Sequence, residues 1–357
     1  MSHSASPKQL LYYLLPRVSR SFYLSVRVLP SSLRPIIGLA YLFCRAADTI
    51  ADTALLPRAQ RRTYLEQYRT VFATGEIVAL GNIHQHLTEV QHNVAERELL
   101  RRLPDCFRFL RELSPDDQQH ICQLVTTLTQ GMQLDLTLFP GETEGRVGAL
   151  EAQTDLDRYT YFVAGCVGEF WTRVVCAHVP RLQQWDVPSM ERKGMHFGKG
   201  LQMTNILRDL AHDIRVGRCY FPRRELMSLG VQPKDLREPT TVERIRPLLD
   251  DLLELTLSYY RDGWEYTLAI PPREWRLRLA CAWPLLIGLS TLALVRRSPD
   301  LLNPTIRIKI TRGQVYGIIF RSLAVIGSNQ ALDRYYQQLL ASGGLVEPGK
   351  ADIRQTA

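Results

Sequence analysis

The stretches YLFCRAADTIAD (Tyr41–Asp52) and LQMTNILRDLAHD (Leu201–Asp213) decide the fold of this chain. Each contains two aspartates spaced i and i+4, namely Asp48 with Asp52 and Asp209 with Asp213. On a helix, residues four apart share one face, with about 6 Å between them. Such carboxylates are the hard oxygen ligands that Mg²⁺ prefers, with water and substrate phosphates filling its other positions. The spacing therefore predicts a helical protein that holds a diphosphate through metal ions.

The residues around the aspartates support this interpretation. An isolated acidic pair is usually a solvated helix face with slightly unfavourable repulsion. Here the first pair has apolar flanks, and Arg45 lies one turn before it, where a guanidinium can bind a carboxylate or a phosphate bidentately. Asn205 and Gln202 share the face of the second pair, and their amides can add neutral oxygen ligands or hydrogen bonds. Two such stripes in one chain favour metal binding over coincidence.

Composition narrows the class of protein and partner. The chain has 357 residues, of which 45% are hydrophobic, and this supports a large globular core. A net charge of +8 suits nucleic acid, an anionic membrane surface or a phosphorylated substrate. The chain has no basic run of five residues and no nucleic-acid-binding signature, which argues against nucleic acid. Seven dispersed cysteines without a CxxC pair indicate reduced thiols in a cytoplasmic protein.

The hydropathy pattern predicts one all-α domain with short joins rich in proline and glycine. The apolar run Leu279–Val295 reaches the lower length limit for a membrane span, but it contains Pro284 and Gly288, and we interpret it as a buried core helix. No signal peptide is expected at the N-terminus. Helices are expected at Ser32–Ala54, Gln60–Phe72, Val90–Leu103, Pro115–Leu138, Leu156–His178, Pro188–Val216, Val242–Leu268, Pro272–Arg297 and Gly313–Ala341.

Two further groups of residues are candidates for chemistry. Tyr159 stands in DRYTYFVAGCVGEFW, where Gly165 and Gly168 lower helix propensity and so indicate a packing or binding role. A tyrosine is more often a core residue than a catalyst. The other group is cationic, because Arg218, Lys309 and Arg312 could carry the charge of a departing pyrophosphate. A single arginine, however, is usually a surface residue.

Five segments together resemble the squalene/phytoene synthase family from about residue 10 to about residue 340. They are VSRSF, YLFCRAADTIAD, YTYFVAGCVG, LQMTNILRDLAHD and GRCYFP, in the family's order and approximate spacing. IKITRGQ and ACAWP are similar to elements of the squalene synthase branch of that family. Such a set of ordered motifs is much more specific than any one of them.

The resemblance implies a single all-α domain over residues 1–357, with the class I isoprenoid synthase fold around a central apolar cavity. It implies that the two aspartate motifs face each other and that two farnesyl diphosphates are joined to presqualene diphosphate and reduced to squalene. The implied cofactors are Mg²⁺, or Mn²⁺, and NADPH, or NADH. A non-reductive relative making dehydrosqualene, hydroxysqualene or phytoene is the alternative. The implied protein is a cytoplasmic monomer with peripheral membrane contact and no nucleic-acid partner.

The family's functional residues carry over to matching positions of this chain. The implied metal ligands are Asp48, Asp52, Asn205, Asp209 and Asp213. Tyr159 joins the four aspartates as the implied catalytic set and moves a proton during cyclopropane formation. The implied substrate-binding residues are Ser19, Ser21, Phe22, Tyr41, Arg45, Val163, Gln202, Arg208 and Arg218. The implied cofactor-binding residues are Arg218, Lys309 and Arg312.

Two positions depart from the squalene synthase pattern. Thr311 stands where a basic residue is frequent, which weakens the expectation of NADPH use. Ala280 stands where an aromatic residue is frequent, which changes the expected shape of the pocket for the second step. No membrane anchor is expected after the final residues RQTA.

Overall fold

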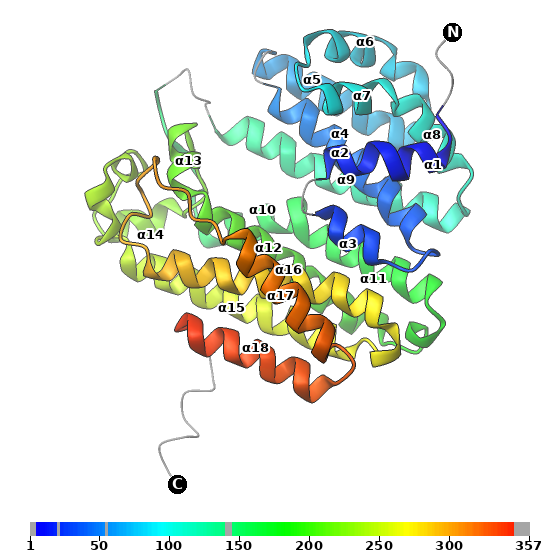
Figure 1. Cartoon of the computed structure of the whole chain (residues 1–357). Coiled ribbons are helices and arrows are strands. Elements are labelled where there is room, and N and C mark those ends of the chain that lie inside the picture. Colours follow the sequence, from blue (N-terminus) through cyan, green and yellow to red (C-terminus); the bar gives the residue numbers. More distant parts are fainter. Residues whose placement is uncertain (1–4, 20–21, 54–55, 140–144, 346–357) are drawn as a thin grey trace. The chain divides into compact units, whose positions relative to one another are not determined.

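A computed structural model describes residues 5–19, 22–53, 56–139 and 145–345, which are helical apart from short loops and two very short strands (Figure 1). The all-α expectation is therefore confirmed. Contacts between Cα atoms group the chain into two compact units. Unit 1 comprises Met1–Leu136 and Glu169–Val187, and unit 2 comprises Thr137–Gly168 and Pro188–Ala357. The expectation of one domain stays a prediction.

Unit 1 is built around α4 (Arg34–Asp52), which contacts α2, α3, α5, α7 and α8. Pro35 lies in the first turn of α4, where a missing N–H costs nothing. The other helical elements of unit 1 are α1 (Pro7–Gln9), the π-helical turn η1 (Leu10–Leu14), α2 (Leu15–Val18), α3 (Phe22–Val28), α5 (Arg58–Thr74), η2 (Ile77–Leu80), α6 (Gly81–Val90), α7 (Val94–Arg101), α8 (Leu103–Arg111), most of α9 (Pro115–Leu138), most of α11 (Cys166–His178) and η5 (Pro180–Leu182).

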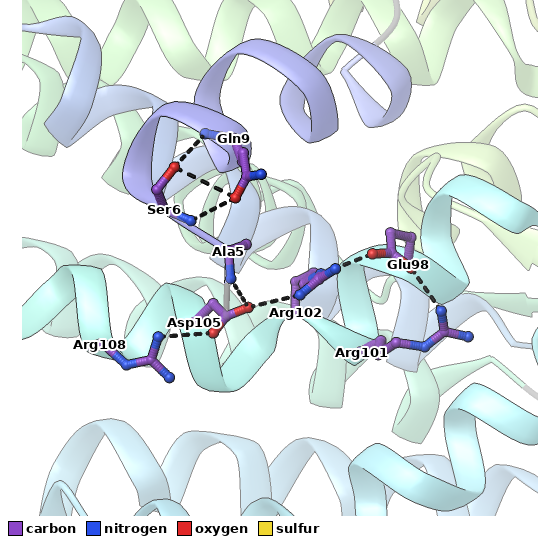
Figure 2. A network of polar contacts seen from close by, with 8 residues as sticks. All are labelled: Ala5, Ser6, Gln9, Glu98, Arg101, Arg102, Asp105 and Arg108. Atoms are coloured by element: carbon purple, nitrogen blue, oxygen red, sulfur yellow. Dashed lines mark hydrogen bonds and ion pairs between the residues drawn. The ribbon is translucent and has the colours of Figure 1, made fainter. Parts of the chain in front are cut away.

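A polar network fastens the N-terminal segment to unit 1 (Figure 2). The Ala5 N–H donates to Asp105 Oδ2 at 2.9 Å, and Arg102 and Arg108 contact the same carboxylate at 3.3 and 3.1 Å. Asp105 is buried, so its charge needs these partners. These contacts with Asp105 hold the segment before α1 on α8, and α8 in turn contacts α4.

Unit 2 is built around α16 (Trp275–Arg297), which contacts α15, α17 and α18. In the described part of the chain, Pro272–Arg297 is the one helical segment long and apolar enough to cross a membrane, and 72% of its apolar window is buried. It is the core helix of unit 2. The other elements of unit 2 are α10 (Gln153–Thr160), the π-helical turn η4 (Tyr161–Gly165), α12 (Val187–Arg208), α13 (Leu210–Arg215), α14 (Arg223–Ser228), η6 (Pro233–Arg237), η7 (Pro239–Val242), α15 (Arg246–Ala269), η8 (Pro272–Glu274), α17 (Arg312–Val325) and α18 (Asn329–Gly343).

The two strands form a short parallel bridge in unit 2. β1 (Gly148–Ala149) pairs with β2 (Arg218–Cys219) in the register Gly148 with Arg218 and Ala149 with Cys219. The bridge continues as the Arg223 N–H donates to the Leu150 carbonyl at 2.8 Å. It fixes the segment after α13 beside the segment that leads into α10.

Helix bounds agree closely at some places and fail at others. Pro115–Leu138 is observed as predicted. The predicted helix Val90–Leu103 is wrong, because α6 ends at Val90 and Asn93 caps α7 by accepting from the Ala95 and Glu96 amides. The predicted helix Gly313–Ala341 is also two helices, since Ser328 caps α18. Such caps satisfy amides that would otherwise lack a partner.

Candidate functional site

The first aspartate pair lies on the least covered stripe of α4, which we call the α4 stripe. The helix buries Leu42, Phe43 and Ala46 completely, because neighbouring helices cover those sides. The stripe itself follows the spacing i, i+4, i+7, i+11, which keeps its members on one helical face. Its first three residues are half-buried and the last is exposed. The members of the α4 stripe are Tyr41, Arg45, Asp48 and Asp52.

Arg45 divides its guanidinium between two carboxylates. Its Nη2 forms a short ion pair with Glu96 Oε1 of α7, and its Nη1 lies 3.6 Å from Asp48 Oδ2. The sequence did not point to Glu96, because no local spacing connects residues 45 and 96. The only sequence signal was the expectation that Arg45 needs an anionic partner.

Asp48 is poorly neutralised by these contacts. The pKa of Asp48 is raised to about 7, because burial and the repulsion of Asp52 raise it and Arg45 offsets only part of that rise. The Asp48 side chain keeps 42% of its surface exposed, so water screens some of this effect. Burial and the Asp52 carboxylate therefore oppose the charge of Asp48, whose partner Arg45 is shared with Glu96. An added cation would relieve the repulsion.

The second pair lies where α12 passes into α13. Asp209 stands at the break, with φ −96° and ψ 9°. Its N–H still donates to the Asn205 carbonyl, and its carbonyl accepts from the Asp213 N–H, both at 2.9 Å. The helical path therefore continues, although Pro188–Val216 was predicted as one helix. These residues and Gln202 form what we call the α12 stripe, in which Asn205 Nδ2 donates to Gln202 Oε1 at 3.4 Å.

Arg208 orients the first carboxylate of this pair. Its Nε donates to Asp209 Oδ1 at 2.8 Å, and its Nη2 forms a short contact with Oδ2. This bidentate hydrogen bonding raises the pKa of Arg208, although burial opposes the shift. Arg208 was predicted to bind substrate, and the structure places it as a partner of Asp209. These contacts fix the orientation of the Asp209 carboxylate.

The donor set of each stripe fits part of a magnesium site. Among the described residues, no three or more His, Cys, Asp and Glu side chains gather as a metal site. Each stripe instead offers two carboxylates, and the α12 stripe adds two amide oxygens. Mg²⁺ is usually bound by one or two carboxylates together with water and substrate phosphates. The residues therefore fit Mg²⁺ bound with a diphosphate, and the meeting of the two stripes stays a prediction.

Tyr159 of α10 is buried in an aromatic stack. Its ring lies on Tyr220, with 4.8 Å between centroids, and its hydroxyl donates to the Tyr220 hydroxyl at 3.2 Å. Phe139 packs edge-on against Tyr220. Tyr220 follows β2, so the strand bridge brings GRCYFP beside α10 and places Arg218 two residues from this pair. The role of Tyr220 was missed because residues 159 and 220 are joined only by the fold.

Small residues let α12 approach the segment after Tyr159 closely. A Cβ atom on Gly198 would lie 2.1 Å from the Ala164 carbonyl oxygen, and one on Gly168 would lie 1.8 Å from the Gly194 carbonyl oxygen. Neither position therefore accepts a side chain. Here the helix contains the π-helical turn η4, which is common near functional sites. The small-residue face thus serves the close packing of α12 against η4 and the start of α11.

An ion pair between a buried lysine and an exposed aspartate joins α12 to α10. Lys199 of α12 is buried, and its Nζ lies 2.7 Å from Asp157 Oδ1 of α10. The Tyr259 hydroxyl of α15 donates to the same oxygen at 2.9 Å. Burial opposes the shift, but these hydrogen bonds lower the pKa of Asp157. Sequence reasoning missed this cluster, although a lysine in an apolar helix stretch was a signal for it.

The remaining predicted residues lie in different parts of the two units. Ser19 is buried and donates from its hydroxyl to the Leu15 carbonyl at 2.6 Å. Ser21 and the side chain of Phe22 lie outside the described residues. Val163 is half-buried in η4. Lys309 and Arg312 are exposed, and in the part of the chain described here neither has a hydrogen-bond or ion-pair partner.

Thr311, the departure noted above, has a structural explanation. Its hydroxyl accepts from the Gln314 N–H at 3.2 Å, and its own N–H donates to Gln314 Oε1 at 2.8 Å. This capping box begins α17. Threonine therefore replaces a charge with a helix cap between Lys309 and Arg312.

An all-α fold with two acidic stripes of this kind defines the class of helical prenyltransferases. The family description squalene/phytoene synthase matches residues 15–314, and the chain belongs to that family. It is 26% identical to the squalene synthase of Yarrowia lipolytica over 95% of this chain and 72% of that protein. The structure of TcSQS with a ligand matches at a TM-score of 0.73 and 25% identity, over 94% and 92% of the two chains. A dehydrosqualene synthase, at 19% identity and a TM-score of 0.63, covers 93% of this chain and all of its own, and supports the fold.

Proposed function

We propose that this chain joins two farnesyl diphosphates head to head to presqualene diphosphate and then reduces that intermediate to squalene with NADPH. The main support for this proposal is that a member of this family has the two acidic stripes, on α4 and on α12. Similarity to squalene synthases over nearly the whole chain supports the choice of product. A chain-elongating prenyltransferase is disfavoured, because its DDxxD motif is absent from the sequence.

In the proposed first step, the acidic stripes bind and orient the diphosphates. Asp48 and Asp52 would supply some of the ligands to the metal ions. The others would come from Asn205, Asp209 and Asp213. Bound Mg²⁺ would supply Lewis-acid charge that makes diphosphate a better leaving group. Arg45 and Arg218 would add cationic charge where pyrophosphate departs. The raised pKa of Asp48 is consistent with a site completed by an added cation.

Tyr159 is proposed to take the proton that is lost when the cyclopropane ring closes. The Tyr159 hydroxyl already donates to Tyr220, so a proton arriving at its oxygen has a hydrogen-bonded route onward. Both rings are buried, and Phe139 packs against Tyr220. Exclusion of water matters here, because water would quench an allylic cation.

Lys309 and Arg312 are proposed to bind a phosphate group in the second step. They are exposed cations immediately before and at the start of α17, and a helix N-terminus favours anions. They therefore fit NADPH or the second diphosphate. The alternative is a non-reductive relative, and Thr311 favours it, because this element offers a cap where a further cation is frequent.

One assay separates the two products. Purified protein is incubated with farnesyl diphosphate and Mg²⁺, with and without NADPH, and the lipids are identified by mass spectrometry. We expect presqualene diphosphate without NADPH and squalene with it. If the same hydrocarbon or alcohol forms with and without NADPH, the chain has the non-reductive activity and is not a squalene synthase. No condensation at all would refute the proposed function.

The proposal includes a cytoplasmic protein that contacts a membrane peripherally as a monomer. Squalene is almost insoluble in water, and the net charge of +8 favours an anionic surface. Velocity sedimentation of the purified protein, with and without detergent, measures its oligomeric state and so tests whether it is a monomer.

A further inference from the structure

An apolar stripe on α17 is turned away from the protein. Tyr316, Phe320 and Leu323 are 58%, 70% and 45% exposed, and we call them the α17 face. Their spacing i, i+4, i+7 keeps them on one side of the helix. The opposite side is buried through Ile318 and Ser322. Trp283 of α16 donates to the Ser322 hydroxyl at 2.9 Å, which fixes the rotation of α17.

The chain around the α17 face is strongly cationic. From residue 301 to residue 332 it contains four Lys and Arg residues and no Asp or Glu, so its formal charge is +4. All four are exposed. Arg321 lies on α17 itself, and Arg307 follows the exposed Ile306 in the preceding extended segment. Exposed aromatic and aliphatic side chains beside basic residues are typical of helices that lie in a membrane interface.

We propose that α17 and the segment before it dock this protein onto an anionic phospholipid surface. Phe320 and Leu323 would enter the boundary between head groups and acyl chains. Tyr316 suits the same boundary, because its ring is apolar and its hydroxyl is polar. Arg307 would contact lipid phosphates, whereas Arg321 is held on α18, where it donates to Gln338 and lies over the Tyr335 ring. The membrane contact is inferred from the α17 face itself. Only its use rests on the proposed function: it would keep an enzyme with a water-insoluble product at the membrane.

A second copy of the chain fits this surface less well. A twofold contact brings the same patch of both copies together. Two segments of charge +4 would then repel each other, and no carboxylate in residues 301–332 could compensate. An anionic bilayer satisfies both the apolar stripe and the cations around it.

Vesicle sedimentation tests the proposal on the full chain without substrate. We expect binding to phosphatidylcholine vesicles containing 30% phosphatidylglycerol, weakened by salt, and little binding to pure phosphatidylcholine. The double variant Phe320→Ser with Leu323→Ser should bind at least tenfold more weakly. Arg307→Gln should weaken binding about fivefold. The matched control is Met227→Ser with Trp275→Ser, which removes exposed apolar side chains elsewhere in unit 2 and should bind like wild type.

Several results would overturn the proposal. These are wild-type binding by the Phe320 and Leu323 double variant, equal loss in the control variant, or equal affinity for neutral and anionic vesicles. A wild-type dimer that the double variant converts to a monomer, seen by light scattering, would assign the face to a second copy. Circular dichroism and thermal unfolding of each variant verify folding. If the wild-type protein binds anionic vesicles as expected but makes no squalene in detergent, the proposed function alone is refuted.

Discussion

Asp48 is a residue whose charge opposes folding. Its pKa is raised to about 7 in the folded chain, against about 4 for an ordinary aspartate. The folded state therefore holds this proton more tightly, and stability falls as pH rises from about 4 to about 7. Without metal at pH 8, Asp48→Asn should be as stable as wild type or more stable, by at most about 1–2 kcal/mol after solvent screening. At pH 4 the difference should vanish.

Urea unfolding in EDTA at the two pH values measures this difference. Asp251→Asn, at an exposed position of α15, is the matched control for the loss of one carboxylate. The same Asp48→Asn protein should lose about 10²–10³-fold in the rate of presqualene diphosphate formation. Wild-type turnover would contradict the metal assignment, and a large loss of stability at pH 8 would contradict the charge argument.

Arg278 is a second residue whose charge opposes folding. It is fully buried in α16, and its three guanidinium nitrogens have no hydrogen-bond partner among the described residues. Burial lowers its pKa accordingly. An unsatisfied buried polar group costs about 1–3 kcal/mol. Arg278→Met should therefore raise the free energy of unfolding by about that amount.

Chemical denaturation of Arg278→Met and of Arg276→Met, an exposed neighbour, measures the effect. Arg276→Met should change little. A clear destabilisation by Arg278→Met would mean that the guanidinium has a partner in solution, such as a bound anion.

At the scale of elements, the contact of α12 with η4 positions the α12 stripe. Gly198→Ala would place a Cβ atom 2.1 Å from the Ala164 carbonyl oxygen, so the two helices must separate. We expect a loss of about 1–3 kcal/mol in stability and a lower rate at unchanged pH optimum. Gly317→Ala is the control, since a Cβ atom there meets nothing within 4 Å. That change should stabilise α17 by up to about 1 kcal/mol.

Substitutions at the start of α17 can distinguish the two proposed reaction steps. Lys309→Ala with Arg312→Ala should spare presqualene diphosphate formation and suppress squalene, because the first-step aspartates are untouched. Thr311→Ala removes the cap but keeps both cations, so it should lose about 1 kcal/mol of stability and still make squalene. Product analysis with NADPH distinguishes them. Normal squalene from the double variant would exclude these cations from the reductive step.

Elements with a continuous apolar period were predictable from sequence, and breaks in that period were less so. α9 has the predicted bounds because nothing in its pattern competes with the helix. The break at Asp209 was missed because it leaves the i, i+4 pattern intact. Glu96 and Tyr220 were missed because their partners lie 51 and 61 residues away in sequence. The local spacing of residues could predict which side chains share one face of a helix. It could not predict which faces of different elements contact each other.

At the scale of the whole molecule, each compact unit carries one acidic stripe on a different part of the chain. The α4 stripe belongs to unit 1 and the α12 stripe to unit 2. The resemblance of both motifs to the squalene/phytoene synthase family implies that they face each other. On that ground we expect the two stripes to act on one metal–diphosphate cluster.

A double-mutant cycle tests this expectation. Calorimetric titration of pyrophosphate at fixed Mg²⁺ is performed on Asp48→Asn, on Asp209→Asn and on the double variant. If both carboxylates serve one cluster, the first substitution removes much of what the second could remove, and the effects differ from additivity by about 0.5–3 kcal/mol. The pair Asp48→Asn with Asp251→Asn is the control and should be additive within about 0.5 kcal/mol. Additivity of the Asp48 and Asp209 changes would mean that the two stripes bind separately, and the head-to-head condensation would then need another arrangement of its diphosphates.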